Sequence, residues 1–230
     1  MQMSEKTLQN LITIAQPRSA ASEAYRTLLT SIDFAGLDKP IRTLMLTSAS
    51  PEEGKSSTLA NLAVVAAQEG RKVIVADCDL RRPSLHSIFG LPNGEGLTTA
   101  LMNAEMLKEP PLRAVGVNGL SVLTSGPIPP NPLELLGSRR MADLLAALAD
   151  RADMVLVDAP PVVAVADAAI LASKVDAVLL VVQAGKAKRD YVERAKVLLE
   201  KANARIIGAA LTNVQADSLL TRYYAAEGSR

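Results

Sequence analysis

The stretch ASPEEGKS, residues 49–56, decides the fold of this chain. An apolar run at 44–46 precedes it, and a pattern typical of a helix continues from 57 to 69. A loop between a strand and a helix points consecutive backbone N–H groups at an anion, which then lies at the positive end of the helix. The stretch therefore predicts a strand, a loop that cradles the phosphates of a nucleotide, and a helix.

Three residues of this loop have the properties that phosphate binding requires. Gly54 permits close approach of the backbone, Lys55 can reach the β- and γ-phosphates, and the hydroxyl of Ser56 can hold Mg²⁺. The remaining predicted nucleotide contacts of the loop are Pro51, Glu52, Glu53 and Ser57. The motif normally begins with Gly, where this chain has Ala49. An ordinary strand–turn–helix is the alternative, and the flanking patterns argue against it.

Two more apolar runs end in carboxylates. Residues 73–76 lead into Asp77 and Asp79, and residues 154–157 lead into Asp158. Such runs are typical of strands buried on both faces of a parallel sheet, where ligands bind outside the carboxyl ends of the strands. Asp158 is then placed to bind Mg²⁺, whereas Asp77 and Asp79 can bind the metal or accept a proton. For each carboxylate alone, capping of a strand end is the alternative.

Composition narrows the class of protein. The 230 residues fit one large domain, and 49% of them are apolar, which suffices for a continuous core. The net charge of +1 gives no overall field that would favour nucleic acid or anionic lipid. The single cysteine, Cys78, excludes an internal disulfide, and we interpret it as a core residue rather than a reactive thiol. No segment is typical of a signal peptide or a membrane span.

Strand and helix patterns alternate along the chain, which predicts an α/β fold with a mostly parallel central sheet flanked by helices. No linker divides the pattern, so residues 1–230 are predicted to form a single domain. Further strands are predicted at 119–124, 177–182 and 205–211, and further helices at 133–151, 164–173 and 188–202.

The N-terminal region contains a predicted helix at 19–34. Its apolar residues recur at helical spacing, namely Tyr25, Leu28, Leu29 and Ile32. Glu23 and Arg26 lie three residues apart on a neighbouring face. They can pair with each other there, or with another subunit.

Together these motifs resemble those of the bacterial tyrosine kinases that regulate capsule and exopolysaccharide export, which are P-loop NTPases on a ParA/MinD-like sheet. Residues 49–56 resemble the Walker A motif of that family, 73–81 its Walker A′ motif and 154–161 its Walker B motif. The sequence GPIPPNPLELL at 126–136 also resembles the family's loop and following helix. The resemblance covers essentially the whole chain and implies an ATP-dependent protein-tyrosine autokinase.

The resemblance implies roles for the carboxylates and the loop. Lys55 would hold phosphates, Ser56 and Asp158 would organise Mg²⁺, and Asp77 and Asp79 would help to activate the tyrosine hydroxyl. Asp77 is expected to bind the metal as well. Whether Asp77 or Asp79 acts as the base stays open at this point. ATP is favoured over GTP because the guanine-reading motif Asn-Lys-x-Asp does not occur.

Other implied contacts lie toward the C-terminus. Thr212 and Asn213, at the end of the last predicted strand, resemble the segment that contacts the adenine base, and Asn213 is the expected contact. Residues 215–230 are predicted to be a flexible tail. Within it, Tyr223 and Tyr224 would accept phosphate.

The resemblance also implies partners. Glu23 and Arg26 resemble part of the family's oligomerisation motif, although Leu29 stands where that motif has a second Arg. The expected partners are the activating cytoplasmic tail of a membrane polysaccharide co-polymerase and a phosphotyrosine phosphatase, with no nucleic acid. The chain would then be cytoplasmic and recruited to the inner face of the membrane.

Two other functions are compatible with the same sheet. A ParA/MinD-like positioning ATPase would carry a lysine and two glycines at 50–52, where this chain has Ser-Pro-Glu. A MinD-like amphipathic membrane tail is also missing from the sequence, because residues 217–230 show no sustained apolar face. The other alternative is a nucleotide-dependent scaffold without kinase activity.

Overall fold

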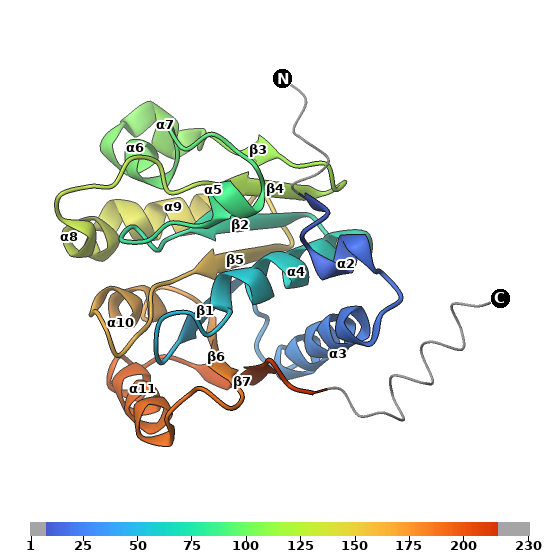
Figure 1. The fold of residues 1–230 in the computed structure, drawn as a ribbon. Coiled ribbons are helices and arrows are strands. Elements are labelled where there is room, and N and C mark those ends of the chain that lie inside the picture. Colours follow the sequence, from blue (N-terminus) through green and yellow to red (C-terminus); the bar gives the residue numbers. More distant parts are fainter. Residues whose placement is uncertain (1–7, 216–230) are drawn as a thin grey trace.

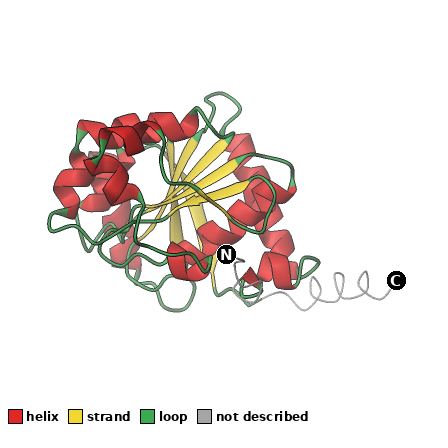
Figure 2. Ribbon diagram, turned by 90° about the horizontal axis from the view of Figure 1, so that it is seen from above, coloured by secondary structure: helices red, strands yellow, loops and turns green. Residues whose placement is uncertain are grey.

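The computed structural model describes residues 8–215, and within them one twisted sheet carries helices on both faces (Figures 1 and 2). The sheet order is β3-β4-β2-β5-β1-β6-β7, and every neighbouring pair is parallel except β3 and β4. The strands are β1 (Thr43–Ser48), β2 (Val73–Asp77), β3 (Arg113–Ala114), β4 (Leu120–Leu123), β5 (Met154–Asp158), β6 (Ala177–Gln183) and β7 (Ile206–Thr212). The mostly parallel α/β architecture predicted from the sequence is confirmed. The two-residue strand β3 was not predicted, because so short a run carries no periodicity.

Ten helices are assigned among the described residues. They are α2 (Ile12–Ala15), α3 (Ala20–Ala35), α4 (Lys55–Gln68), α5 (Leu85–Ile88), α6 (Leu97–Met102), α7 (Ala104–Lys108), α8 (Pro132–Gly137), α9 (Arg139–Ala149), α10 (Asp167–Ala172) and α11 (Arg189–Lys201). None of them combines the length and the hydropathy that crossing a membrane requires. The predicted tail with Tyr223 and Tyr224 lies outside the described residues.

Each central strand contributes to two apolar clusters, one on each face of the sheet. In β1, Leu44 and Leu46 belong to the cluster under α3 and α4, whereas Met45 belongs to the cluster under α9, α10 and α11. This alternation follows from the period of two in a strand. Because both faces are covered, the strands read as continuous apolar runs, which is why the sequence identified them. Cys78 is fully buried, as predicted.

One predicted helix is divided in the structure. The single helix expected at 133–151 is two helices, α8 and α9, that meet at Ser138. Ser138 has an extended backbone, and its Oγ accepts a hydrogen bond from the amide of Met141, which makes it the N-cap of α9. Capping by the hydroxyl stabilises a new helix start at this position, so the apolar periodicity alone was misleading.

The N-terminal helix α3 packs on α4, the helix that follows the phosphate loop. Leu29 and Ile32 are buried, and Tyr25 and Leu28 pack against the same cluster, so the apolar stripe of α3 is core. Immediately before it, α2 is fastened to α4 by a buried polar contact at Thr13. The side-chain oxygen of Asn61 accepts hydrogen bonds from the amide of Thr13 (3.2 Å) and from its hydroxyl (2.9 Å).

We expect Asn61→Leu to lower the free energy of unfolding by about 1–3 kcal/mol, because it leaves two buried donors of Thr13 without an acceptor. Leucine has the same number and branching of side-chain heavy atoms as asparagine and leaves no cavity, so a loss from an empty space is excluded. The measurement is urea unfolding followed by circular dichroism. Thr30→Val, which removes an exposed hydroxyl bonded to the carbonyl of Arg26, serves as the control. Equal stability of Asn61→Leu and the wild type would contradict this role of the contact.

Candidate functional site

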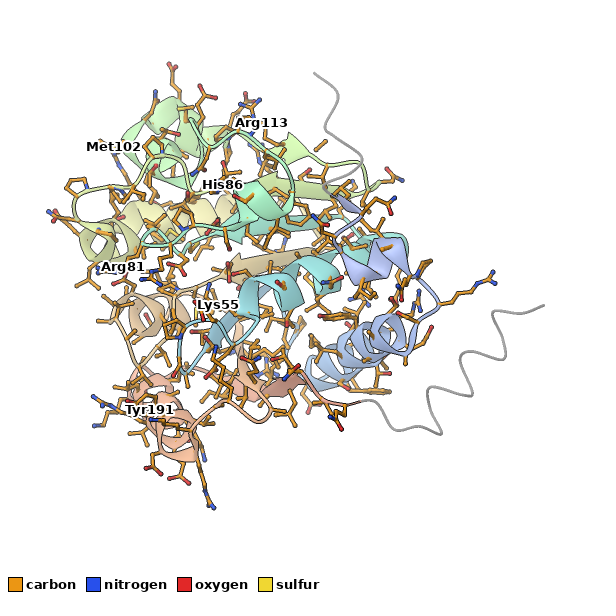
Figure 3. All side chains as sticks on the ribbon, in the orientation of Figure 1. Lys55, Arg81, His86, Met102, Arg113 and Tyr191 are labelled. Atoms are coloured by element: carbon orange, nitrogen blue, oxygen red, sulfur yellow. The ribbon has the colours of Figure 1, made fainter. Side chains whose placement is uncertain are left out.

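The phosphate loop connects β1 to α4 at the carboxyl end of the sheet. Gly54 has φ +86°, and Glu52 adopts the same left-handed region with φ +60°, so the loop turns tightly at two positions. The hydroxyl of Ser48 donates to the carbonyl oxygen of Ser50 at 2.7 Å and holds the entry to the loop. Lys55 lies at the start of α4, on the side of the molecule where the strands end (Figure 3).

The loop presents unpaired amide donors. Within residues 8–215, the backbone N–H groups of Glu53, Gly54, Lys55 and Ser56 donate to no protein acceptor. The last two belong to the first turn of α4, where helical N–H groups have no partner in the helix, and the helix dipole adds positive potential there. The arrangement is suited to bind a polyphosphate.

A cluster of charges surrounds the lysine of the loop. The Nζ of Lys55 lies 3.0 Å from Asp79 Oδ2, 3.1 Å from Asp158 Oδ1 and 3.1 Å from the Oγ of Ser56. Burial lowers the pKa of Lys55, but the charges of Asp158 and Asp79 outweigh burial, so the pKa is raised above its ordinary value. Lys55 therefore remains an ammonium ion at neutral pH.

The structure brings Asp77 and Asp158 to neighbouring positions, since they are partners in the parallel register of β2 and β5. Both side chains are fully buried. Burial and the charge of Asp158 raise the pKa of Asp77 to about 8. Burial also raises the pKa of Asp158, although the charge of Lys55 and the hydroxyl of Ser56 oppose this. Two carboxylates thus share a site that favours one proton between them.

The three acidic residues differ in what they contact. Oδ2 of Asp77 accepts hydrogen bonds from the amides of Ser84 (3.0 Å) and Leu85 (2.9 Å), and its Oδ1 has no partner within the described chain. Asp79 binds the amide of Arg82 through Oδ1 and is the only one of the three that lines the adjoining cleft. Of the two candidate bases, Asp79 therefore faces the space that a substrate can enter.

The oxygen atoms for a magnesium ion are provided by two elements. The Oγ of Ser56 donates to Asp158 Oδ2 at 2.6 Å, which brings a hydroxyl and a carboxylate together at the loop. Among the described residues, no group of three His, Cys, Asp or Glu side chains has the arrangement of a metal site. Mg²⁺ is commonly held by one or two carboxylates together with substrate phosphates and water, so the residues present fit this ion.

The cleft beside the loop has a volume of about 500 Å³ and includes residues whose roles the sequence did not indicate. Arg81 lies on one wall, and its guanidinium forms two hydrogen bonds, of 2.8 and 3.1 Å, with the fully buried Asp167 at the start of α10. Pro160 and Pro161 also line the cleft. The double arginine after Asp79 and the double proline after Asp158 were visible in the motifs, but neither pattern indicated a contact.

The other predicted contacts are distributed as follows. Pro51, Glu52 and Ser57 line the cleft, whereas the side chain of Glu53 is 1% exposed and turns back to the amide of Ala49. Asn213 directly follows β7 with φ +56°. Of the four further loop contacts predicted from the sequence, Glu53 alone is therefore absent from the lining of the cleft.

The pair at the N-terminal helix is formed within the chain. Arg26 Nη1 makes an ion pair with Glu23 Oε1, and Nη2 donates to the carbonyl oxygen of Pro17 at 2.9 Å. Both side chains are about one-third exposed, at 34% each, so they are partly accessible from outside. The intramolecular pairing that was one of the two alternatives is thus present.

The loop, the helix after it and the acidic strand ends define a P-loop NTPase of the ParA type. A family model described as ParA, NUBPL iron-transfer P-loop NTPase, matches residues 42–216. P-loop NTPases of this type bind a nucleotide together with Mg²⁺.

Relatives narrow the class. Tyrosine-protein kinase YwqD of Bacillus subtilis is 45% identical over 88% of this chain and 85% of its own length. CapB of Staphylococcus aureus is 36% identical over 97% and 98%, respectively. The solved kinase domain of the Escherichia coli tyrosine kinase ETK superposes with a TM-score of 0.85 at 38% identity, over 90% of this chain and 81% of that domain. The chain belongs to the bacterial tyrosine-protein kinase family. It spans 28% of the length of the longer relative Etk.

We expect Asp77→Asn to change how stability depends on pH. The folded protein holds a proton at Asp77 between pH 3.8 and about 8, where the unfolded chain has released it. The stability from this carboxyl is therefore full below pH 4 and is lost as the pH rises toward 8. Asparagine keeps an oxygen for the two amides and has no charge to bury.

Melting temperatures in EDTA at pH 5 and pH 9 test this expectation. The difference in favour of Asp77→Asn should widen by about 8–16 °C at the higher pH, since the three pH units from 5 to 8 correspond to about 4 kcal/mol. Asp150→Asn, at an exposed carboxyl, is the control. A constant difference at both pH values would show that Asp77 is not protonated in the folded state at pH 5.

Proposed function

We propose that this chain transfers the γ-phosphoryl group of ATP to tyrosine residues of its own kind, including Tyr223 and Tyr224. The observation that carries this proposal is the position of Lys55, which lies between Asp79 and Asp158 at a loop of unpaired amides. Kinship with tyrosine-protein kinases supports the choice of tyrosine as acceptor. The family's link to capsule and exopolysaccharide export places the proposed role in such a system.

The proposed division of labour follows from the chemistry of phosphoryl transfer, which asks mainly for positioning and neutralisation of charge. The loop amides and the ammonium group of Lys55 would hold the phosphates, and Pro51, Glu52, Glu53 and Ser57 would complete the loop around them. Ser56 and Asp158 would hold Mg²⁺, together with Asp77 on the adjacent strand. When bound, this ion would offset further negative charge on the phosphates.

The acceptor step requires a base on the open side of the site. The tyrosine oxygen attacks the γ-phosphorus, the bond from this phosphorus to the β–γ bridging oxygen breaks, and ADP leaves with that oxygen. The phenolic proton passes to a carboxylate, which is useful because free tyrosine has a pKa of about 10. We assign this role to Asp79, since it lines the cleft and Asp77 does not. Asn213, beside the loop at the end of β7, is proposed to contact the adenine.

We propose that a membrane adaptor with a cytoplasmic tail recruits the chain to the inner face of the membrane and activates it, and that a phosphotyrosine phosphatase reverses the modification. An activating tail must bind the nucleotide-competent state more tightly than the resting state, because equal affinity shifts no equilibrium. No contact with nucleic acid is part of the proposal. The adaptor arm is tested by adding the tail peptide to the autophosphorylation assay described next, where an unchanged rate would count against it.

Incubation with Mg-ATP should add phosphate to Tyr223 or Tyr224, as read by mass spectrometry of tryptic peptides. Lys55→Met should reduce this signal at least about 100-fold, because the ammonium group stabilises charge in the transition state. Circular dichroism and melting of the variant check that it folds. Near wild-type phosphorylation of Lys55→Met would show that the loop takes no part in the reaction. Absence of phosphotyrosine in the wild type would contradict the kinase assignment.

We also propose self-association through Glu23 and Arg26. Their partial exposure leaves the pair accessible to a second copy. Within one helix such an exposed pair adds only about 0.3–0.5 kcal/mol to stability. Sedimentation velocity over a wide concentration range should give a smaller species for Glu23→Ala/Arg26→Ala than for the wild type. The matched control is Arg189→Ala/Glu193→Ala, an exposed pair on α11. Identical profiles of the first variant and the wild type would exclude this surface.

A further inference from the structure

The outer side of the phosphate loop is supported by the end of the sheet. The hydroxyl of Thr212, the last residue of β7, donates to the carbonyl oxygen of Glu53 at 2.8 Å. From the turn after β6, the Nζ of Lys186 lies 3.4 Å from the carbonyl oxygen of Glu52. These two contacts connect the end of β7 and the turn after β6 to the backbone carbonyl groups of Glu53 and Glu52.

The hydrogen bond from Thr212 determines which way the N–H of Gly54 points. Within the described chain every peptide bond is trans, so the carbonyl of one residue and the N–H of the next point in opposite directions. The carbonyl of Glu53 and the N–H of Gly54 belong to one peptide unit. Because Thr212 holds that carbonyl on the β7 side, the N–H of Gly54 is directed to the other side of the loop.

A second contact fixes the same residue from within. The carboxylate of Glu53 is buried, lies 3.3 Å from the amide of Ala49 and is absent from the lining of the cleft among the described residues. Its negative charge therefore points away from the place where phosphates would bind. Glu53 is held at its side chain by the start of the loop and at its carbonyl by Thr212.

The hydroxyl of Thr212 is placed by the sheet and not by the loop. Thr212 is in register with Gln183 of β6, and its carbonyl oxygen accepts a hydrogen bond from the amide of Ala184 at 2.9 Å. Its methyl group lies 3.5 Å from the position that a Cβ on Gly54 would take, so the side chain packs against the turn it supports. A rigid element thus carries the donor.

We propose that Thr212 is a positioning residue for nucleotide phosphates, which it orients through the Glu53–Gly54 peptide without touching them. This inference rests on the proposed nucleotide-binding function of the loop. A loop already held in its binding conformation loses less conformational freedom when the ligand binds, and this raises affinity. The same hydroxyl connects the phosphate loop to the strand that continues into Asn213, the proposed adenine contact.

Two substitutions separate the hydroxyl from the shape of the side chain. Thr212→Val keeps the branched shape and removes the donor, whereas Thr212→Ser keeps the donor and removes the methyl group. We expect Thr212→Val to bind Mg-ADP about 2- to 10-fold more weakly than the wild type, the range of one hydrogen bond. Thr212→Ser should bind within about twofold of the wild type. Thr30→Val is the matched control on α3, and isothermal titration calorimetry is the measurement.

A second measurement needs no nucleotide. In ¹⁵N–¹H correlation spectra the amide signal of Gly54, whose peptide carbonyl would lose its hydrogen bond, should shift in Thr212→Val and stay close to the wild-type position in Thr212→Ser. Wild-type affinity of Thr212→Val would overturn the inference about Thr212 and leave the proposed function intact. The same holds if Thr212→Ser binds as weakly as Thr212→Val. Failure of the wild type to bind Mg-ADP would overturn the proposed function and this inference with it.

Discussion

The ion pairs of Lys55 with Asp79 and Asp158 are the interaction on which the site depends. Asp158 and Asp77 are fully buried at the ends of adjacent strands, and two buried carboxylates without compensation would be strongly destabilising. Lys55 provides the compensating charge, and Ser56 together with the amides of Ser84 and Leu85 satisfies further oxygens. The raised pKa of Asp77 shows that the compensation is incomplete. This residual cost is typical of sites arranged for binding charged ligands.

Strand order makes this cluster possible. β1 lies between β5 and β6, and β5 lies between β1 and β2, so the loop after β1 is next to the carboxylates of β5 and β2. The parallel register aligns Asp77 with Asp158 at the same height. Helix α4 then starts at the loop and runs back across the sheet, where α2 and α3 pack against it. The N-terminal helices therefore contact the helix that begins at the loop, and α3 also contacts β7.

Much of the fold could be predicted because both faces of the sheet are covered. Runs such as 73–76 and 154–157 alternate between two apolar clusters and so contain no polar positions. The break at Ser138 was missed because the apolar period continues across it, while the cap that divides α8 from α9 is a single hydroxyl. The predicted loop residues Lys55 and Ser56 are brought together with Asp79 and Asp158, because parallel strands deliver their carboxyl ends to the same edge of the sheet.

The sequence by itself determined the phosphate loop, the strands that end in carboxylates and the family, because each depends on neighbouring residues and regular spacing. Only the tertiary structure decided that Asp79 faces the cleft while Asp77 is turned toward the amides of Ser84 and Leu85. It also decided that Arg81 pairs with Asp167 and that Thr212 supports Glu53, which lies 159 residues away. Such contacts follow from strand order and register, and these arise from packing of the whole chain rather than from any local pattern.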